Sequence, residues 1–221
     1  MSSDKTQLTH FRDKMAYPIY LTIGNIPKQI RRKLSSRVQI LIGYIPVTKF
    51  TSISNKSARR RALANLFHAC LREVLGPISS YGETGLEMSS GDGIWRRCHP
   101  IFAIFVADYQ EQVLVTCTYN GRCPKCMIPA DQLGKYESFL PHVQSLVLDI
   151  YDLADGNVHT FHQACGKTGM KPVYHPFWEM LPLVDIFILI TPDILHQVLQ
   201  GMVRHLVAWL ISIFGTVAID T

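Results

Sequence analysis

The stretch of residues 98–126 constrains the fold more than any other part of the chain. An uncharged apolar run, residues 101–107, ends at the acid Asp108, and a short amphipathic segment follows. A run of this length, rich in apolar residues, is typical of a buried strand. A carboxylate at the end of a buried strand is how many metal-dependent nucleases hold their ions. We therefore expect a central strand that ends at a candidate metal ligand.

The same stretch closes on a Cys-x-x-Cys pair, Cys123 and Cys126, after an Asn-Gly turn. Such a pair after a tight turn is the common half of a zinc site. The neighbouring cations Arg122 and Lys125 favour the thiolate form, which is the form that binds Zn²⁺. The other half must come from later in the chain, or the two cysteines are unligated. The candidates for that half are Asp193, His196, His162, Cys165 and His205.

Charge is distributed unevenly along the chain. Residues 1–75 hold 14 Lys and Arg against 3 Asp and Glu, whereas residues 76–221 hold 8 and 14. A basic N-terminal third indicates a polyanionic partner such as nucleic acid, and a solvated basic surface is the alternative. The cations that we expect to meet phosphates are Arg31, Arg32, Lys33, Arg59, Arg60 and Arg61.

Composition excludes several classes of protein. An apolar content of 48% and a charged content of 18% exclude a disordered chain. Six cysteines do not make a disulfide scaffold in 221 residues. The start is polar, unlike a signal peptide, and the longest uncharged apolar run, residues 205–219, is shorter than the roughly 20 residues that span a bilayer. We expect a soluble, intracellular protein without a membrane helix.

The apolar patterns predict an α/β core interrupted by a helical insertion. Two early β-rich runs suit an antiparallel pair with a basic connection, and helical patterns follow. The predicted strands are 17–24 and 38–45, and the predicted helices are 55–75, 109–118, two segments within 130–165, and 192–214. Gly76-Pro77 is expected to end the first helix, Gly166 to cap the second in 130–165, and Thr191 to cap the last. Predicted core residues include Cys70, Cys98, Cys117, Trp95, Trp178 and Trp209.

Asp4 and Asp108 are the acids best placed for catalysis. Phosphodiester cleavage with two Mg²⁺ ions needs acids that bridge metals roughly 4 Å apart. One carboxylate near each of two adjacent strand ends, together with a third acid, meets that need. The alternatives are that Asp4 is a terminal loop acid and that Asp108 only caps the helix that follows it.

Several motifs in order resemble the Plavaka transposases of fungi. This family belongs with the Kyakuja-Dileera-Zisupton group, near the CACTA-type cut-and-paste enzymes. The resemblance extends from residue 3 to about residue 210. It is carried by residues 3–9 (SDKTQLT), 17–25 (YPIYLTIGN), 105–111 (FVADYQE), 123–126 (CPKC) and 185–201 (DIFILITPDILHQVLQG).

The resemblance implies an RNase H-like fold with a D-D-E triad that holds two Mg²⁺ or Mn²⁺ ions. Asp4 matches the first acid and Asp108 the second. The C-x-x-C pair and the D-x-x-H motif, Asp193 and His196, match the motifs of a helical insertion, which favours His196 over His205 for zinc. The implied division is a partial catalytic core over 1–121 and the insertion over 122–221. DNA is the implied partner, the nucleus the implied location, and a complete transposase is expected to form homo-oligomers.

The chain departs from the family pattern at both ends. Only three residues precede Asp4, so the strand that should present it is expected to be cut short and frayed. The family's catalytic glutamate lies beyond the long helix, and no acid before Thr221 takes its place. The sequence is therefore expected to be a transposase fragment with little or no strand-cleaving activity. The alternative is a zinc-containing DNA-binding module without catalysis, from a domesticated or decayed element.

Overall fold

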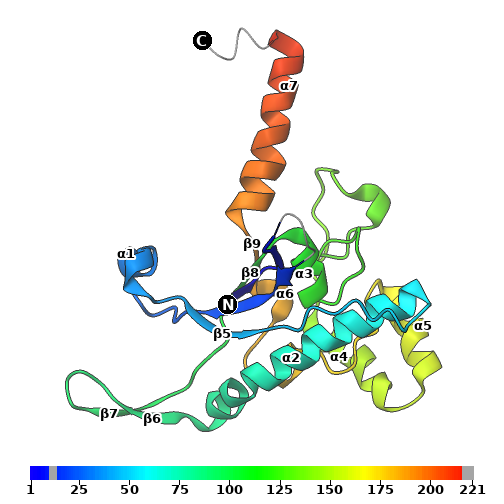
Figure 1. The fold of residues 1–221 in the computed structure, drawn as a ribbon. Helices are drawn as coiled ribbons and strands as arrows, with labels where there is room; N and C mark the ends of the chain where they lie inside the picture. The colour runs from blue at the N-terminus through cyan, green and yellow to red at the C-terminus, as the bar shows by residue number, and fades with distance from the viewer. Residues whose placement is uncertain (10–13, 216–221) are drawn as a thin grey trace.

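The structure, a computed structural model, describes residues 1–9 and 14–215 of the chain. At its centre lies a mixed five-stranded sheet with the strand order β5-β4-β1-β8-β9 (Figure 1). These strands are β1 (Ser2–Ser3), β4 (Pro18–Leu21), β5 (Ile40–Tyr44), β8 (Phe105–Ala107) and β9 (Ile190–Pro192). Two hairpins lie outside this sheet: β2 (Thr6–Gln7) with β3 (Met15–Ala16), and β6 (Leu86–Ser89) with β7 (Trp95–Cys98).

The strand directions bring three strand ends to one edge of the sheet. β4 runs antiparallel to β1 and to β5, so the predicted antiparallel pair is confirmed. β8 runs parallel to β1 and to β9. Because parallel strands end at the same edge, the residues that follow β1, β8 and β9 leave the sheet together. Those residues are Asp4, Asp108 and Asp193.

The first strand is short, but it lies in the middle of the sheet. Ser2 pairs with Tyr20 on one side and with Val106 on the other. The ladder extends to Met1, whose carbonyl accepts a hydrogen bond of 2.9 Å from the Val106 amide. The expectation of a frayed strand before Asp4 is therefore wrong, because neighbours on both sides hold the backbone of β1.

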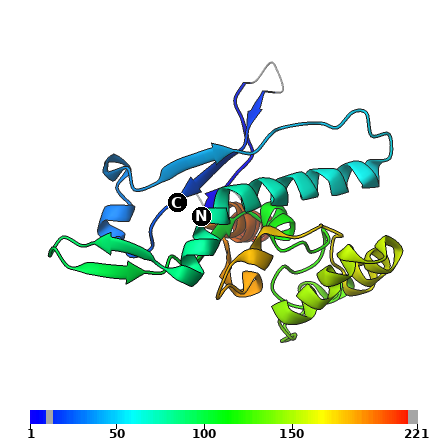
Figure 2. The ribbon, with the colours of Figure 1, turned by 90° about the horizontal axis from the view of Figure 1, so that it is seen from below.

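The described helices lie outside the sheet, and α2 is the longest of them. They are α1 (Lys28–Arg31), α2 (Lys56–Thr84), α3 (Tyr109–Val115), α4 (Gln144–Tyr151), α5 (Val158–Thr168), α6 (Ile186–Leu189) and α7 (Arg204–Phe214). Short 3-10 turns are η1 (Leu34–Ser36), η2 (Ala130–Gln132), η3 (Asp152–Asp155) and η4 (Phe177–Met180), and η5 (Ile194–Val203) is π-helical. Figure 2 shows α2 lying beside the sheet, with α4 and α5 beyond its N-terminal half.

Helix α2 does not end at Gly76-Pro77 as predicted but continues to Thr84. A side chain before a proline clashes with the proline ring in helical conformation, and glycine at position 76 avoids that clash. Contacts on both sides of Pro77 hold the helix in place. Before the proline, Leu75 is fully buried, and after it, the Ser79 hydroxyl donates to the carbonyl oxygen of Met180. Gly85, with φ 78°, then ends the helix.

One hydrophobic core joins residues from both halves of the chain. It combines Phe67 and Leu71 of α2 with Phe105 of β8, Trp178 of η4 and Ile190 of β9. The last two, and β9 itself, lie in the range 122–221 that the sequence assigned to an insertion.

Only part of the predicted core is buried. Trp178 and Cys117 are buried as expected, and Cys70 is half-buried. Trp95, Trp209 and Cys98 are exposed, which corrects the prediction for these three residues. Trp95 and Cys98 lie in the β6-β7 hairpin, which extends away from the sheet (Figure 1).

The last helix begins later than predicted and extends away from the sheet (Figure 1). Pairing of residues 190–192 with β8 places the N-cap at Asp193 rather than at Thr191. None of the residues in η5 and α7 is buried. The helix spans 21 residues with a mean hydropathy of 1.3, so by length and composition it could cross a membrane. The sequence analysis considered only the longest uncharged run and so did not predict a helix of this length and hydropathy. Helices of soluble proteins can have the same length and hydropathy, so these two values do not show that the helix crosses a membrane.

Candidate functional site

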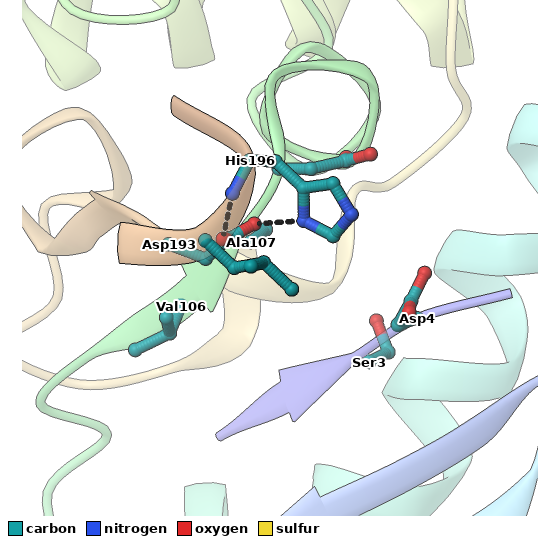
Figure 3. Close-up of a pocket in the computed structure, with 8 residues that line it drawn as sticks. Ser3, Asp4, Val106, Ala107, Asp193 and His196 are labelled. Carbon is teal, nitrogen blue, oxygen red and sulfur yellow. Dashed lines mark hydrogen bonds and ion pairs between the residues drawn. The ribbon is translucent and has the colours of Figure 1, made fainter. Parts of the chain in front are cut away.

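A cavity of about 240 Å³ lies at the edge of the sheet where β1 and β8 end (Figure 3). Four polar residues singled out from the sequence line it together. They are Asp4, Asp108, Asp193 and His196. Ser3, Val106, Ala107 and Leu195 complete the lining. The strand ends thus gather residues that are nearly 200 positions apart in the chain.

Asp4 and Asp108 occupy corresponding places after two adjacent parallel strands. Asp4 is exposed, and its Oδ2 accepts a 3.5 Å hydrogen bond from the Thr6 hydroxyl. Asp108 is half-buried and caps α3, because its Oδ1 accepts a 2.7 Å hydrogen bond from the Glu111 amide. The expectation that Asp108 can cap the helix that follows it is therefore confirmed. Since the cap uses Oδ1, it is compatible with a second role for Asp108 in the cavity.

Asp193 and His196 form a bonded pair on the opposite wall. Asp193 Oδ1 accepts from the His196 amide at 2.7 Å, and Oδ2 lies 2.8 Å from His196 Nδ1. The hydrogen bond to Asp193 raises the pKa of His196, and the charges of Asp108 and Asp4 add to the rise. Burial acts to raise the pKa of Asp193, but the hydrogen bonds from His196 outweigh it and lower that pKa. Figure 3 shows the His196 ring between Asp193 and the side of the cavity that carries Asp4.

A buried acid, Glu111, lies behind the cavity, and the sequence analysis did not identify it as a site residue. Its two carboxylate oxygens accept hydrogen bonds from the hydroxyls of Ser3 and Tyr17. Burial raises the pKa of Glu111 to about 7; these two hydrogen bonds oppose the rise, and the charges of Asp108 and Asp4 add to it. The sequence feature that could have identified Glu111 is an acid three residues after Asp108, within a short helix whose other residues are uncharged.

The donor chemistry of the cavity fits Mg²⁺ or Mn²⁺. Mg²⁺ is usually bound through one or two carboxylates together with waters and substrate phosphates, rather than in a complete protein cage. Asp4 and Asp108 supply two carboxylates on one cavity. Among the described residues, no group of three or more His, Cys, Asp or Glu is placed to hold a metal ion by itself. The residues present therefore suit an ion that substrate phosphate helps to hold.

Cys123 of the cysteine pair lines a different cavity, of about 390 Å³, together with Tyr109 and Lys125. The Lys125 amide donates to Cys123 Sγ at 3.3 Å, and His142 Nε2 lies 3.1 Å from the Cys123 carbonyl oxygen. Burial raises the pKa of Cys126, and its interaction with Cys123 adds to the rise.

A tetrahedral zinc site needs four ligands. Asp193 and His196 lie instead with Asp4 and Asp108, and Cys165 is buried in the core. His162 and His205 also join no metal-holding group within the part of the chain that the structure describes. The arrangement as it stands does not fit Zn²⁺, and the zinc site at Cys123 and Cys126 stays a prediction.

The predicted nucleic-acid contacts form two separate basic groups. Arg31, Arg32 and Lys33 lie at the end of α1, and Arg59, Arg60 and Arg61 in the first turns of α2. Figures 1 and 2 place these two helix ends on opposite sides of the molecule. One arginine of each group also binds backbone: Arg31 Nε donates to Ile26 at 2.7 Å, and Arg59 Nη2 donates to Ile53 at 2.6 Å.

Comparison with models of known protein families identifies the family of the chain. The family model described as Plavaka transposase matches residues 1–210, which is nearly the whole chain. The chain therefore belongs to the Plavaka transposase family. Searches of curated proteins and of solved structures found no match. Membership in a transposase family makes DNA the expected partner of this chain.

Proposed function

We propose that the chain is the catalytic region of a cut-and-paste DNA transposase, which cleaves and transfers DNA strands with divalent metal ions. The observation that supports this proposal is the meeting of Asp4, Asp108, Asp193 and His196 on one cavity at the ends of parallel strands. The strand order, with three antiparallel strands followed by two parallel ones, also suits the RNase H-like core that the family resemblance implies. Such an enzyme would act on nuclear DNA.

Each residue of the cavity has a distinct part in this proposal. Asp4 and Asp108 would hold the Mg²⁺ or Mn²⁺, which supplies charge stabilisation at the reacting phosphate and activates the attacking oxygen. Asp193 orients the His196 ring through Nδ1 and favours its protonated form, because it raises the pKa of His196. The imidazolium then offers a donor and a positive charge to a phosphate oxygen of the DNA.

We expect residues 1–221 to cleave DNA only slightly. Two-metal strand cleavage in this proposal uses three acids, and Asp193 is the remaining carboxylate at the cavity. Both of its oxygens are already bonded to His196. Metal binding, which needs only Asp4 and Asp108, is therefore the property to test on this chain.

The test is a titration with Mn²⁺, followed by electron paramagnetic resonance of the free ion. Asp4→Asn and Asp108→Asn are expected to weaken Mn²⁺ binding at least about tenfold, because each removes a charged ligand. Asn at position 108 still caps α3, so the fold is retained. Asp131→Asn is the matched control, since Asp131 is an exposed acid of η2 outside the cavity. Equal Mn²⁺ affinity in Asp108→Asn and wild type would contradict the proposal.

The alternative function is a zinc-containing DNA-binding module without catalysis, and fewer observations support it than support the catalytic region. It rests on Cys123 and Cys126 and on the Lys125 amide that donates to the Cys123 sulfur. The described residues supply no second half for the zinc site. The cavity of acids at the strand ends also has no role in this alternative, and we therefore favour the catalytic region.

A further inference from the structure

We infer that Glu111 is a positioning residue that fixes the separation of Asp4 and Asp108, through hydrogen bonds to Ser3 and Tyr17 on one side and to Asp108 on the other. This inference rests on the proposed function of the cavity and extends it to a residue outside its lining.

On one side, Glu111 is tied to the two strands that carry and support Asp4. Its Oε1 accepts from the hydroxyl of Ser3, the last residue of β1 and the neighbour of Asp4. Its Oε2 accepts from the hydroxyl of Tyr17, which directly precedes β4. Ser3 is 4% exposed, Tyr17 8% and Glu111 9%, so little water competes for these bonds. Buried hydrogen bonds to a charged group are stronger than neutral ones.

On the other side, Glu111 is tied to Asp108 through its own backbone. The Glu111 amide donates to Asp108 Oδ1 at 2.7 Å, which also fixes the rotamer of Asp108 at the N-terminus of α3. A continuous path therefore runs from Asp4 through Ser3 and Glu111 to Asp108.

Stability alone does not explain a carboxylate in this place. Burial of a carboxyl group opposes folding, as the raised pKa of Glu111 reflects, and apolar residues in place of Glu111, Ser3 and Tyr17 would fill the same space without that cost. Metal ligands, by contrast, have to be held at defined positions, and residues that hydrogen-bond to the ligands or to their supports typically change metal affinity 10- to 100-fold. Among the residues that the structure describes, Glu111 is the buried acid, and its side chain accepts hydrogen bonds from both Ser3 and Tyr17.

The test compares Mn²⁺ affinity in Glu111→Ala and Glu111→Gln. Glu111→Ala removes both side-chain hydrogen bonds, and the dissociation constant for Mn²⁺ is expected to rise about tenfold or more. Glu111→Gln keeps an acceptor for one hydroxyl and a donor for the other, so it is expected to stay within about threefold of wild type. Glu179→Ala is the matched control: it removes a partly buried acid that is bonded to His175, away from the cavity.

Circular dichroism first verifies that each variant is folded. If Glu111→Ala does not fold, Ser3→Ala and Tyr17→Phe replace it, since each removes one hydroxyl and is expected to raise the dissociation constant severalfold. A folded Glu111→Ala with wild-type affinity, while Asp108→Asn loses Mn²⁺, would overturn the positioning role and leave the proposed function intact. Equal losses in Glu111→Gln and Glu111→Ala would also overturn it, because charge rather than hydrogen bonding would then be responsible. Failure of Asp108→Asn to alter binding would instead count against the proposed function.

Discussion

At the scale of single residues, His68 shows how the core fixes the protonation state of an ionisable group. Its ring is fully buried in α2, with Nε2 3.0 Å from the Leu114 carbonyl oxygen and Nδ1 3.4 Å from the Phe177 amide. Nδ1 accepts from that amide only when the ring is neutral. Burial lowers the pKa of His68 to about 4, and the bond to the Leu114 carbonyl opposes part of that shift.

This environment predicts acid sensitivity. A histidine with a lowered pKa stabilises the fold above its unfolded pKa of about 6.5, and that stability is lost as pH falls from 6.5 towards 4. We expect the free energy of unfolding to fall by about 3 kcal/mol between pH 7 and pH 4 through His68. In His68→Gln, an amide can make both hydrogen bonds without titrating. Urea unfolding of both proteins at the two pH values checks this, and an identical fall in both would contradict it.

The sequence identified the four polar residues that line the candidate site, but not how the fold brings them together. Asp108 was identifiable because it ends an apolar run, and Asp193 and His196 because they form a motif. Their convergence was not predictable, since it depends on β9 joining the sheet next to β8. Glu111 was missed because an acid in a short helix normally indicates an exposed face. Only the positions of Ser3 and Tyr17 reveal its hydrogen bonds.

At the scale of elements, the C-terminal turns of α2 show what packing adds to local sequence. Gly82 lies against the loops before β8 and after η4. A Cβ atom there would stand 2.6 Å from Pro182 Cγ and 3.1 Å from the Pro100 carbonyl oxygen. Such close approach is a tertiary reason for a glycine, and it explains why a helix that contains Pro77 still continues.

We expect Gly82→Ala to destabilise the protein by about 1–3 kcal/mol, because the added methyl group forces the backbone of α2 away from its neighbours. Gly166→Ala in α5 is the matched control. A Cβ there meets nothing within 4 Å, and alanine is expected to stabilise the helix by roughly 0.5–1 kcal/mol. Thermal unfolding of both variants tests the pair. A fall in stability for Gly166→Ala as large as that for Gly82→Ala would contradict the packing argument.

The periodicity of apolar residues predicted where the helices lie but not the residues at which they begin and end. The helices at 55–75 and 192–214 exist, but their boundaries depend on contacts distant in sequence. The end of α2 depends on packing against residues 100 and 182, and the start of η5 depends on the pairing of residues 190–192 with β8. Gly166 was expected to cap α5, yet the cap is Gly169, whose φ of 75° suits glycine.

At the scale of the whole molecule, the acidic cavity and the basic residues are separated. In the proposed function, the cavity needs negative charge to hold metal ions, whereas DNA phosphates need positive charge, so the cations that meet DNA are expected outside the cavity. The charge counts of the sequence predicted the excess in residues 1–75 but not its division between α1 and α2. That division follows from the fold, which places the two helix ends on opposite sides (Figures 1 and 2).

Two separate basic groups predict additive contributions to DNA binding. Affinity is expected to fall steeply between about 50 and 200 mM salt, because each phosphate contact releases counterions. Arg32→Gln and Arg60→Gln replace an exposed cation in each group, and each is expected to reduce the slope of log affinity against log salt by up to about 1. Because the two sites are distant, the double variant should show the sum of the two changes.

The control for this experiment is Arg96→Gln in the β6-β7 hairpin. It removes the same charge from the molecule, but Arg96 is paired with Asp92 at 2.7 Å and is already neutralised. We expect its slope to equal that of wild type, because a paired guanidinium releases few counterions from DNA. Fluorescence anisotropy with a labelled duplex at four salt concentrations measures all the slopes. An affinity that does not change with salt, or an equal effect of Arg96→Gln, would show that DNA is not bound through these two groups.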